Sequence, residues 1–304
     1  MRNERQNSTR VLLDPDSLTV AAPRRLFHLD KSPGGTKIAS ARTANKEDEM
    51  ISKLVRLTLF GLSSVVLGTI LWAQPVPPAA CSNGSLTGRY GFAINGTANG
   101  NPITAVGQIA TNGNGTLAGN ETISQNGALG NLLEVLGTYS IKSNCTGTMT
   151  IQAAGHSKQN FSVTVISGGQ QIDMVQADSG TTELGTAQAQ GSTSCSSAGA
   201  KGVYGLQGAG TEIGVGPLAL GGQITLRGDG TLTGTETVSI NGTVASKQKI
   251  SGAFKVIRIC QGAAVIQVGN QGPIHLNLVV VNGGRGILFI QGDSNTLVSG
   301  SLQR

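Results

Sequence analysis

The chain has 304 residues, of which 45 are glycine, and only 12% of its residues are charged. An apolar content of 38% can still build a core, which excludes a highly charged disordered chain. The formal net charge of +6 arises mostly in residues 1–80, which carry 11 basic and 7 acidic side chains. Residues 81–304 carry 11 basic and 9 acidic side chains, without a basic face interleaved with aromatics. We therefore do not expect nucleic acid as a partner.

The N-terminal 80 residues are expected to be targeting sequence rather than fold. Residues 1–49 are polar and rich in arginine, and we interpret them as a disordered or non-translated upstream segment. Residues 50–73 begin at Met50 with two basic side chains and continue with a largely apolar run, the pattern of a secretory signal peptide. An uncleaved signal anchor is the alternative, and only in that case would the chain contact a membrane, through this segment. Residues 74–80 form a Pro-rich linker.

The remainder of the chain is a duplication. Shifted by 114 to 115 residues, the sequence meets itself at short colinear matches. They include Gly88-Arg-Tyr-Gly91 with Gly202-Val-Tyr-Gly205, Glu121-Thr122 with Glu236-Thr237, Gln176 with Gln291, and Asp178 with Asp293. A period of this length indicates two whole domains rather than a solenoid of short repeats. We assign repeat 1 to residues 81–190, a linker to 191–194 and repeat 2 to 195–304.

The four cysteines occupy matched positions in the two repeats. An even number of cysteines in an exported chain indicates two disulfides, although sequence alone allows three pairings. The repeat favours Cys81–Cys145 and Cys195–Cys260. No Cys-x-x-Cys pair and no neighbouring histidine accompany them, so we expect neither a zinc site nor another metal or cofactor. This usage favours a secreted, periplasmic or cell-surface location.

Each repeat shows the pattern of an antiparallel meander. β-Branched and apolar residues alternate with Thr, Ser and Gln, and turn dipeptides such as Asn126-Gly127 and Asn241-Gly242 separate the runs. In repeat 1 we expect strands near 88–95, 103–111, 115–125, 131–142, 146–153, 160–166, 170–177 and 182–189. Eight short strands can close into a barrel and so remove the sheet edges. The predicted fold is all-β, with two tandem antiparallel meander β-barrels of about eight strands each; two β-sandwiches are the alternative.

Two segments of repeat 1 carry a family resemblance. Leu86-Thr-Gly-Arg-Tyr90, followed by the hairpin Asn114-Gly-Thr-Leu-Ala-Gly119, resembles the start of calycin-type barrels such as the avidins and lipocalins. The duplicated whole is similar to uncharacterised exported bacterial proteins made of such repeats. This resemblance implies binding of a small molecule in the barrel lumen. A biotin site is not expected, because the only tryptophan, Trp72, lies in the predicted signal peptide.

Strand parity identifies candidate ligand-binding residues. Side chains two residues apart share one face of a strand. On that basis four polar side chains share the apolar face of their strands: Glu121, Gln176, Glu236 and Gln291. They are polar contacts for a ligand if the barrels close. Because a buried carboxylate is costly, we favour the alternatives: a bulge at Gly119 or Gly234 that reverses the facing of the strand, or a glutamate at the barrel mouth.

The remaining polar candidates do not form a catalytic pattern. His156 and His275 occupy unmatched positions, and no nucleophile elbow, metalloprotease motif or phosphate-binding loop is present in the sequence. Asp178 and Asp293 each precede a turn, so we interpret them as turn formers rather than metal ligands.

These observations favour a protein that is not an enzyme. We expect a secreted or envelope-associated structural or interaction protein built of two disulfide-stapled barrels. The alternative is a calycin-like carrier that binds a small apolar molecule in the barrel lumen. The expected partner is accordingly a small apolar ligand or a component of the envelope.

Overall fold

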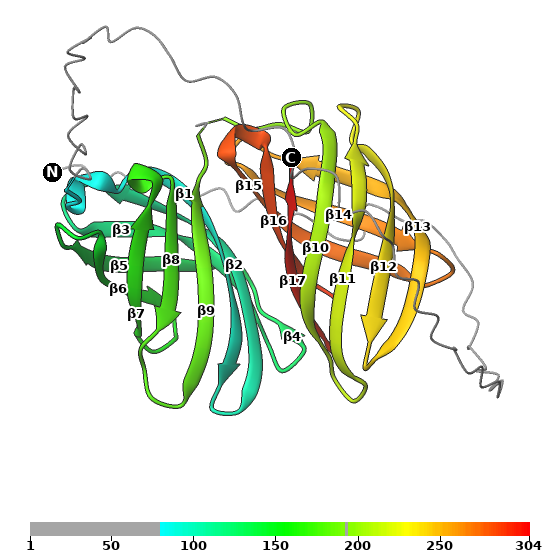
Figure 1. Ribbon diagram of the computed structural model, residues 1–304, viewed down its shortest axis with the longest axis horizontal. Helices are drawn as coiled ribbons and strands as arrows, with labels where there is room; N and C mark the ends of the chain where they lie inside the picture. Colours follow the sequence, from blue (N-terminus) through cyan, green and yellow to red (C-terminus); the bar gives the residue numbers. More distant parts are fainter. Residues whose placement is uncertain (1–79, 192–193) are drawn as a thin grey trace, which may run out of the picture. The chain divides into compact units, whose positions relative to one another are not determined.

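The computed structural model describes residues 80–191 and 194–304, and each repeat in it is a closed β-barrel (Figure 1). This confirms the predicted all-β class with two tandem eight-stranded barrels. The expectations for the upstream segment, the signal peptide and residues 74–79 fall outside the described residues. Within the described part of the chain, no helix combines the length and the apolar character that crossing a bilayer requires.

Barrel 1 closes through eight antiparallel strands that follow one another in chain order. They are β1 (Thr87–Ala98), β2 (Asn101–Asn112), β3 (Thr116–Gln125), β5 (Leu133–Ile141), β6 (Thr146–Ala153), β7 (Gln159–Ile166), β8 (Gln171–Gln176) and β9 (Thr181–Ala189). The pairing of β9 with β1 closes the ring. A further short strand, β4 (Ala128–Leu129), was not expected from the sequence. It forms because Asn126 and Gly127, at φ values of 49° and 76°, turn the chain back along β3.

Barrel 2 repeats this path. Its strands are β10 (Gly202–Glu212), β11 (Gly216–Leu226), β12 (Thr231–Ile240), β13 (Thr243–Val256), β14 (Gln261–Val268), β15 (Pro273–Val281), β16 (Gly286–Gln291) and β17 (Thr296–Gln303). The ring closes where β17 pairs with β10. Three short 3-10 turns complete the described structure: η2 (Asn83–Ser85), η3 (Ser167–Gly169) and η4 (Asn282–Gly284).

The alternation of the sequence places most of the buried apolar side chains in the lumens. On β7, for example, Phe161, Val163 and Val165 are buried while Ser162 and Thr164 are exposed. Barrel 1 is filled by large side chains, among them Phe92, Met149, Phe161 and Met174. Burying each such side chain contributes about 1.5 to 3 kcal/mol to folding.

A disulfide ties the chain that enters each barrel to a turn at one end of it, which we call the disulfide end. Cys81 bonds to Cys145 in the β5–β6 turn, and Cys195 bonds to Cys260 in the β13–β14 turn. These are the pairings that the repeat favoured. Cys145 and Cys260 both have φ of 65°, so even the left-handed backbone of the turn is repeated.

A buried tyrosine closes the same end of each lumen. The Tyr90 hydroxyl donates to the carbonyl of Gly169 at 2.8 Å, and the Tyr204 hydroxyl donates to the carbonyl of Gly284 at 2.6 Å. Gly169 has φ of 95°, and a Cβ there would collide with the carbonyl oxygen of Ser85. Glycine is therefore required at this turn. The opposite end of barrel 2, bounded by turns 213–215, 241–242, 269–272 and 292–295, is called its mouth below.

Candidate functional site

The two predicted glutamates face the lumens, and the bulges expected at Gly119 and Gly234 are absent. The β2–β3 pairing runs unbroken through Ile109 and Gly119, and the β11–β12 pairing runs unbroken through Ile224 and Gly234. The expected bulges were wrong because both glycines fit the regular ladder. In barrel 2 the register does shift, on the β12–β13 pairing, but only between Glu236 and Val238.

Among the buried side-chain oxygens of repeat 1 that have no hydrogen-bond partner within the described residues, three lie on lumen-facing acidic or amide side chains. They belong to Glu121, Gln176 and Glu183, whose side chains are at most 9% exposed. Glu121 is therefore not at a solvated mouth, as one alternative supposed. Sequence reasoning missed Glu183. The signal that identifies it is Val298, the apolar residue at the matched position of repeat 2, which marks that position as inward-facing.

The environment of the two barrel 1 carboxyls favours their neutral forms. Burial raises the pKa of Glu121 to about 7, and the negative charge of Glu183 adds to that effect. Burial likewise raises the pKa of Glu183 to about 7, with a further contribution from Asp178. Two carboxyls that face a common lumen in this way hold protons near neutral pH that free carboxyls would release.

Asp178 and Asp293 each accept hydrogen bonds from two neighbouring strands instead of bonding within their own turns. We call this arrangement the aspartate bracket. Asp178 accepts hydrogen bonds from the backbone N–H and the side-chain amide of Asn160, both at 2.7 Å, and from Gln176 Nε2 at 3.1 Å. These bonds lower the pKa of Asp178. The interpretation as turn formers was thus incomplete, because the carboxylates fix a glutamine that borders the lumen.

Barrel 2 carries the same bracket with a histidine in place of the asparagine. Asp293 Oδ2 accepts from the His275 backbone N–H and from Gln291 Nε2, both at 3.0 Å. Asp293 Oδ1 lies 2.7 Å from His275 Nδ1. His275 itself faces outward and is exposed, so it orients Asp293 from outside the lumen.

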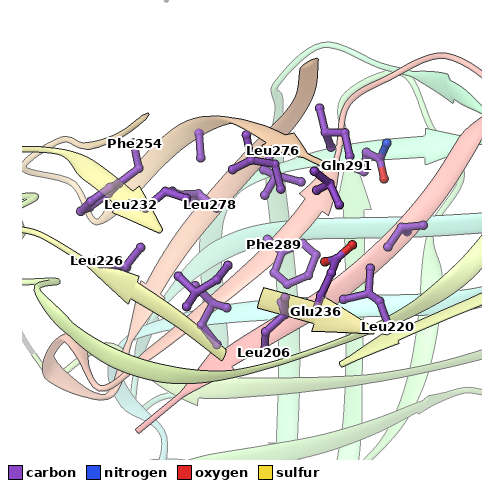
Figure 2. A pocket seen from close by; sticks show the side chains of 17 residues that line it. Leu206, Leu220, Leu226, Leu232, Glu236, Phe254, Leu276, Leu278, Phe289 and Gln291 are labelled. Atoms are coloured by element: carbon purple, nitrogen blue, oxygen red, sulfur yellow. The ribbon is translucent and has the colours of Figure 1, made fainter. Parts of the chain in front are cut away.

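A cavity of about 60 Å³ occupies the lumen of barrel 2 (Figure 2). Fifteen of the seventeen lining residues are apolar, and the two polar ones are Glu236 and Gln291. Leu220, Ile274 and Leu276 are partly exposed, so the cavity reaches the surface on the side of the mouth. Glu236 is 7% exposed, and burial raises the pKa of its carboxyl. Thus two of the four predicted residues meet at one cavity.

Two neighbouring matched positions of the repeats contribute to the space in barrel 2. Met149 of β6 pairs with Tyr139, and its counterpart Ala264 pairs with Phe254, so the register confirms the match. Phe161, which follows across the sheet from Met149, has the smaller Leu276 as its counterpart. Two large side chains of barrel 1 are therefore replaced by smaller ones on the cavity wall of barrel 2.

The arrangement offers binding chemistry rather than a metal site. Among the described residues, no group of three His, Cys, Asp or Glu side chains could hold a metal ion. His156 is exposed in the β6–β7 turn. The cavity instead combines an apolar wall with a carboxyl and an amide near its mouth, the composition typical of a small-molecule site.

Comparison with known protein families finds no family model that matches this chain, and comparison with curated proteins finds no match either.

Proposed function

We propose that this protein is an exported, non-catalytic binding protein in which the lumen of barrel 2 holds a small, largely apolar molecule. Barrel 1 is then the filled structural partner. The observation that carries the proposal is the apolar cavity of barrel 2, which reaches the surface and is lined by a carboxyl with no hydrogen-bond partner among the described residues. The two disulfides support an oxidising compartment as the site of action.

The cavity suits a short apolar chain. Its volume of about 60 Å³ is less than half of the roughly 150 Å³ that binds benzene in an engineered apolar cavity. A chain of a few carbons fills such a space, and each buried CH₂ group contributes about 0.8 kcal/mol. A longer molecule would extend through the mouth, past Leu220 and Ile274.

The calycin-like carrier therefore becomes the preferred proposal for barrel 2, and the structural role remains the proposal for barrel 1. The lumen of a closed eight-stranded barrel is wide enough either to be filled by side chains or to hold one small ligand. A filled lumen, by contrast, adds stability and a surface but leaves no space for a ligand. The two functions expected from the sequence are thus assigned to different repeats.

Native mass spectrometry without reductant tests the proposal. The full sequence would be expressed with export to an oxidising compartment, and the protein purified in the form that accumulates there. We expect a mass excess that disappears on denaturation, or binding of small apolar molecules that are added afterwards. A bare mass together with no binding of any added molecule would contradict the proposal.

A matched pair of variants tests the location. Ala264→Met places the side chain of barrel 1 at the matched position on the cavity wall, and it should abolish binding. Ala263→Met adds the same atoms to the outer face of β14, and it should bind as the wild type does. Equal binding by both variants would move the site away from this lumen.

A further inference from the structure

We propose that the barrel 2 cavity selects molecules whose polar end donates hydrogen bonds, and primary alkylamines above all. This inference rests on the proposed function of the cavity and adds the chemical class of the ligand. It follows from the two polar groups on the cavity wall, which both present acceptor atoms.

The bracket at the mouth fixes which atom Gln291 presents. A carboxylate only accepts hydrogen bonds, so the contact of Gln291 with Asp293 Oδ2 at 3.0 Å must be made by the amide NH₂ group. Asp293 is held in turn by the backbone and ring of His275. The amide oxygen of Gln291 is left, and in Figure 2 it is turned to the side on which the Glu236 carboxyl lies. Gln291 therefore contributes an acceptor.

Glu236 approaches from the opposite wall and has no partner of its own. It lies on β12, four strands around the ring from β16 in either direction. Its side chain is 93% buried, and none of the hydrogen bonds of the described residues involves its carboxyl. An ionised carboxylate offers only acceptors. The Glu236 oxygens are not among the atoms cut off from both solvent and a partner, so a ligand that supplies donors would replace water at this carboxyl.

No cation of the barrel occupies this position among the described residues. The residue paired with Glu236 on β13 is Gln248, which donates to the Ser246 carbonyl at 3.2 Å. The other lumen-facing residues around the cavity are apolar apart from Gln291. Glu212, partly exposed at the end of β10, adds a second carboxylate at the mouth. Lys247, in the β13 bulge, is exposed.

The acceptor atoms on the cavity wall predict an order of affinity for three ligands that share one short alkyl chain and differ in the polar end. An alkylammonium supplies three N–H donors and neutralises Glu236. An alcohol supplies one donor without charge. A carboxylate adds lone pairs and a like charge, which the acceptor wall repels. The expected order of affinity is therefore amine, then alcohol, then carboxylate.

Titration of the purified protein with n-butylamine, 1-butanol and butyrate at pH 7.5, followed by two-dimensional NMR, tests the order. We expect n-butylamine to bind at least tenfold more tightly than 1-butanol, and butyrate to give no saturable shift. Equal or tighter binding of butanol or butyrate would overturn the amine selectivity while leaving the proposed cavity function intact. Failure of all three to bind would overturn both.

Glu236→Gln separates a ligand contact from a structural role. The variant should lose at least tenfold in affinity for butylamine and stay within twofold for butanol, which reports an intact cavity. Glu121→Gln, the matched change in barrel 1, should alter neither affinity. A parallel loss for both molecules, or no loss for the amine, would reject Glu236 as the amine contact.

A pH series on the wild type gives a second readout if Glu236→Gln does not accumulate. Burial raises the pKa of Glu236, and an ammonium binds best to its ionised form. Affinity for butylamine should therefore rise from pH 5 to pH 8, while affinity for butanol stays level. A level amine profile would overturn the proposal.

Discussion

Glu121 on β3 and Glu183 on β9 point into the same lumen, and each has a carboxyl oxygen with no hydrogen-bond partner among the described residues. Repeat 2 keeps the counterpart of Glu121, which is Glu236, but it has Val298 at the position that matches Glu183. Barrel 1 thus has both carboxyls in its lumen, whereas in barrel 2 Glu236 is the one carboxyl among the residues that line the cavity. The difference at this one position separates a lumen with two buried carboxyls from a lumen with one carboxyl beside a cavity.

The carboxyl pair predicts that barrel 1 loses stability as the pH rises. Both pKa values lie at about 7 in the barrel, against 4.5 ordinarily. Between these values the unfolded chain has released protons that the barrel still holds, so the free energy of unfolding falls with rising pH. The contribution is complete below pH 4.5 and is lost as the pH passes 7. We expect a fall of about 2 to 4 kcal/mol for the pair.

Urea unfolding from pH 4.5 to 8, with peptide-resolved hydrogen exchange to separate the barrels, checks this expectation. Glu183→Val installs the residue of repeat 2 and should make the profile of barrel 1 shallower, because only Glu121 then keeps a pKa that burial raises. We expect a gain of about 1 to 3 kcal/mol at pH 8. Glu134→Gln, at an exposed site on β5, should keep the wild-type profile. An unchanged slope in Glu183→Val would show that the pair does not cause the loss.

Local sequence signals were sufficient for the path of the chain. Asn126-Gly127 and its counterpart Asn241-Gly242 require positive φ, and that requirement locates hairpins without knowledge of the rest of the fold. The disulfide pairing was also predictable, because the separations of 64 and 65 residues repeat with the barrels. Strand alternation then decided which face of each strand meets the lumen.

Features that depend on neighbours across the barrel were not predictable in this way. The bulge after Glu236 arises on β13, whose 14 residues exceed the 10 of β12, and nothing at Gly234 reports that difference. The hydrogen bond that Asn160 of β7 donates to Asp178 joins a strand to a turn 18 residues further along the chain. The cavity depends on the summed volume of side chains from all eight strands, which no single segment encodes.

Because the lumen of barrel 2 contains a cavity, we expect the two barrels to differ in stability change when the side chains of Met149 and Ala264 are exchanged between them. Met149 is 1% exposed within a filled lumen, so Met149→Ala should destabilise barrel 1 by about 2 to 5 kcal/mol. Ala264→Met adds its atoms to existing space and should change the stability of barrel 2 by about 1 kcal/mol or less.

Denaturant titration of both variants, again resolved by peptide, compares the two changes. Unequal effects would support the difference in filling on which the proposed function depends. If Ala264→Met destabilised barrel 2 as much as Met149→Ala destabilises barrel 1, the space in barrel 2 would be unable to accept a side chain, and a ligand of similar size would not fit.

We expect the aspartate bracket of barrel 1 to affect stability alone and that of barrel 2 to affect both stability and ligand selectivity. Asp178→Ala removes three hydrogen bonds that hold Asn160 and Gln176, and it should destabilise barrel 1 by about 1 to 2 kcal/mol, a modest loss because the carboxylate is partly exposed. Since these bonds lower the pKa of Asp178, their contribution is present above pH 3.8 and is lost as the pH falls below that value.

Asp293→Ala should have a similar effect on the stability of barrel 2 and an additional effect on binding. Without the carboxylate, the Gln291 amide is free to turn and present its NH₂ group to the cavity, so a carboxylate ligand would meet a donor there. We therefore expect the preference for butylamine over butyrate to narrow in Asp293→Ala and to persist in Asp178→Ala. The NMR titrations at pH 7.5 measure both ratios. A preference that survives Asp293→Ala unchanged would show that Glu236 alone sets the selectivity and that the bracket serves only the fold.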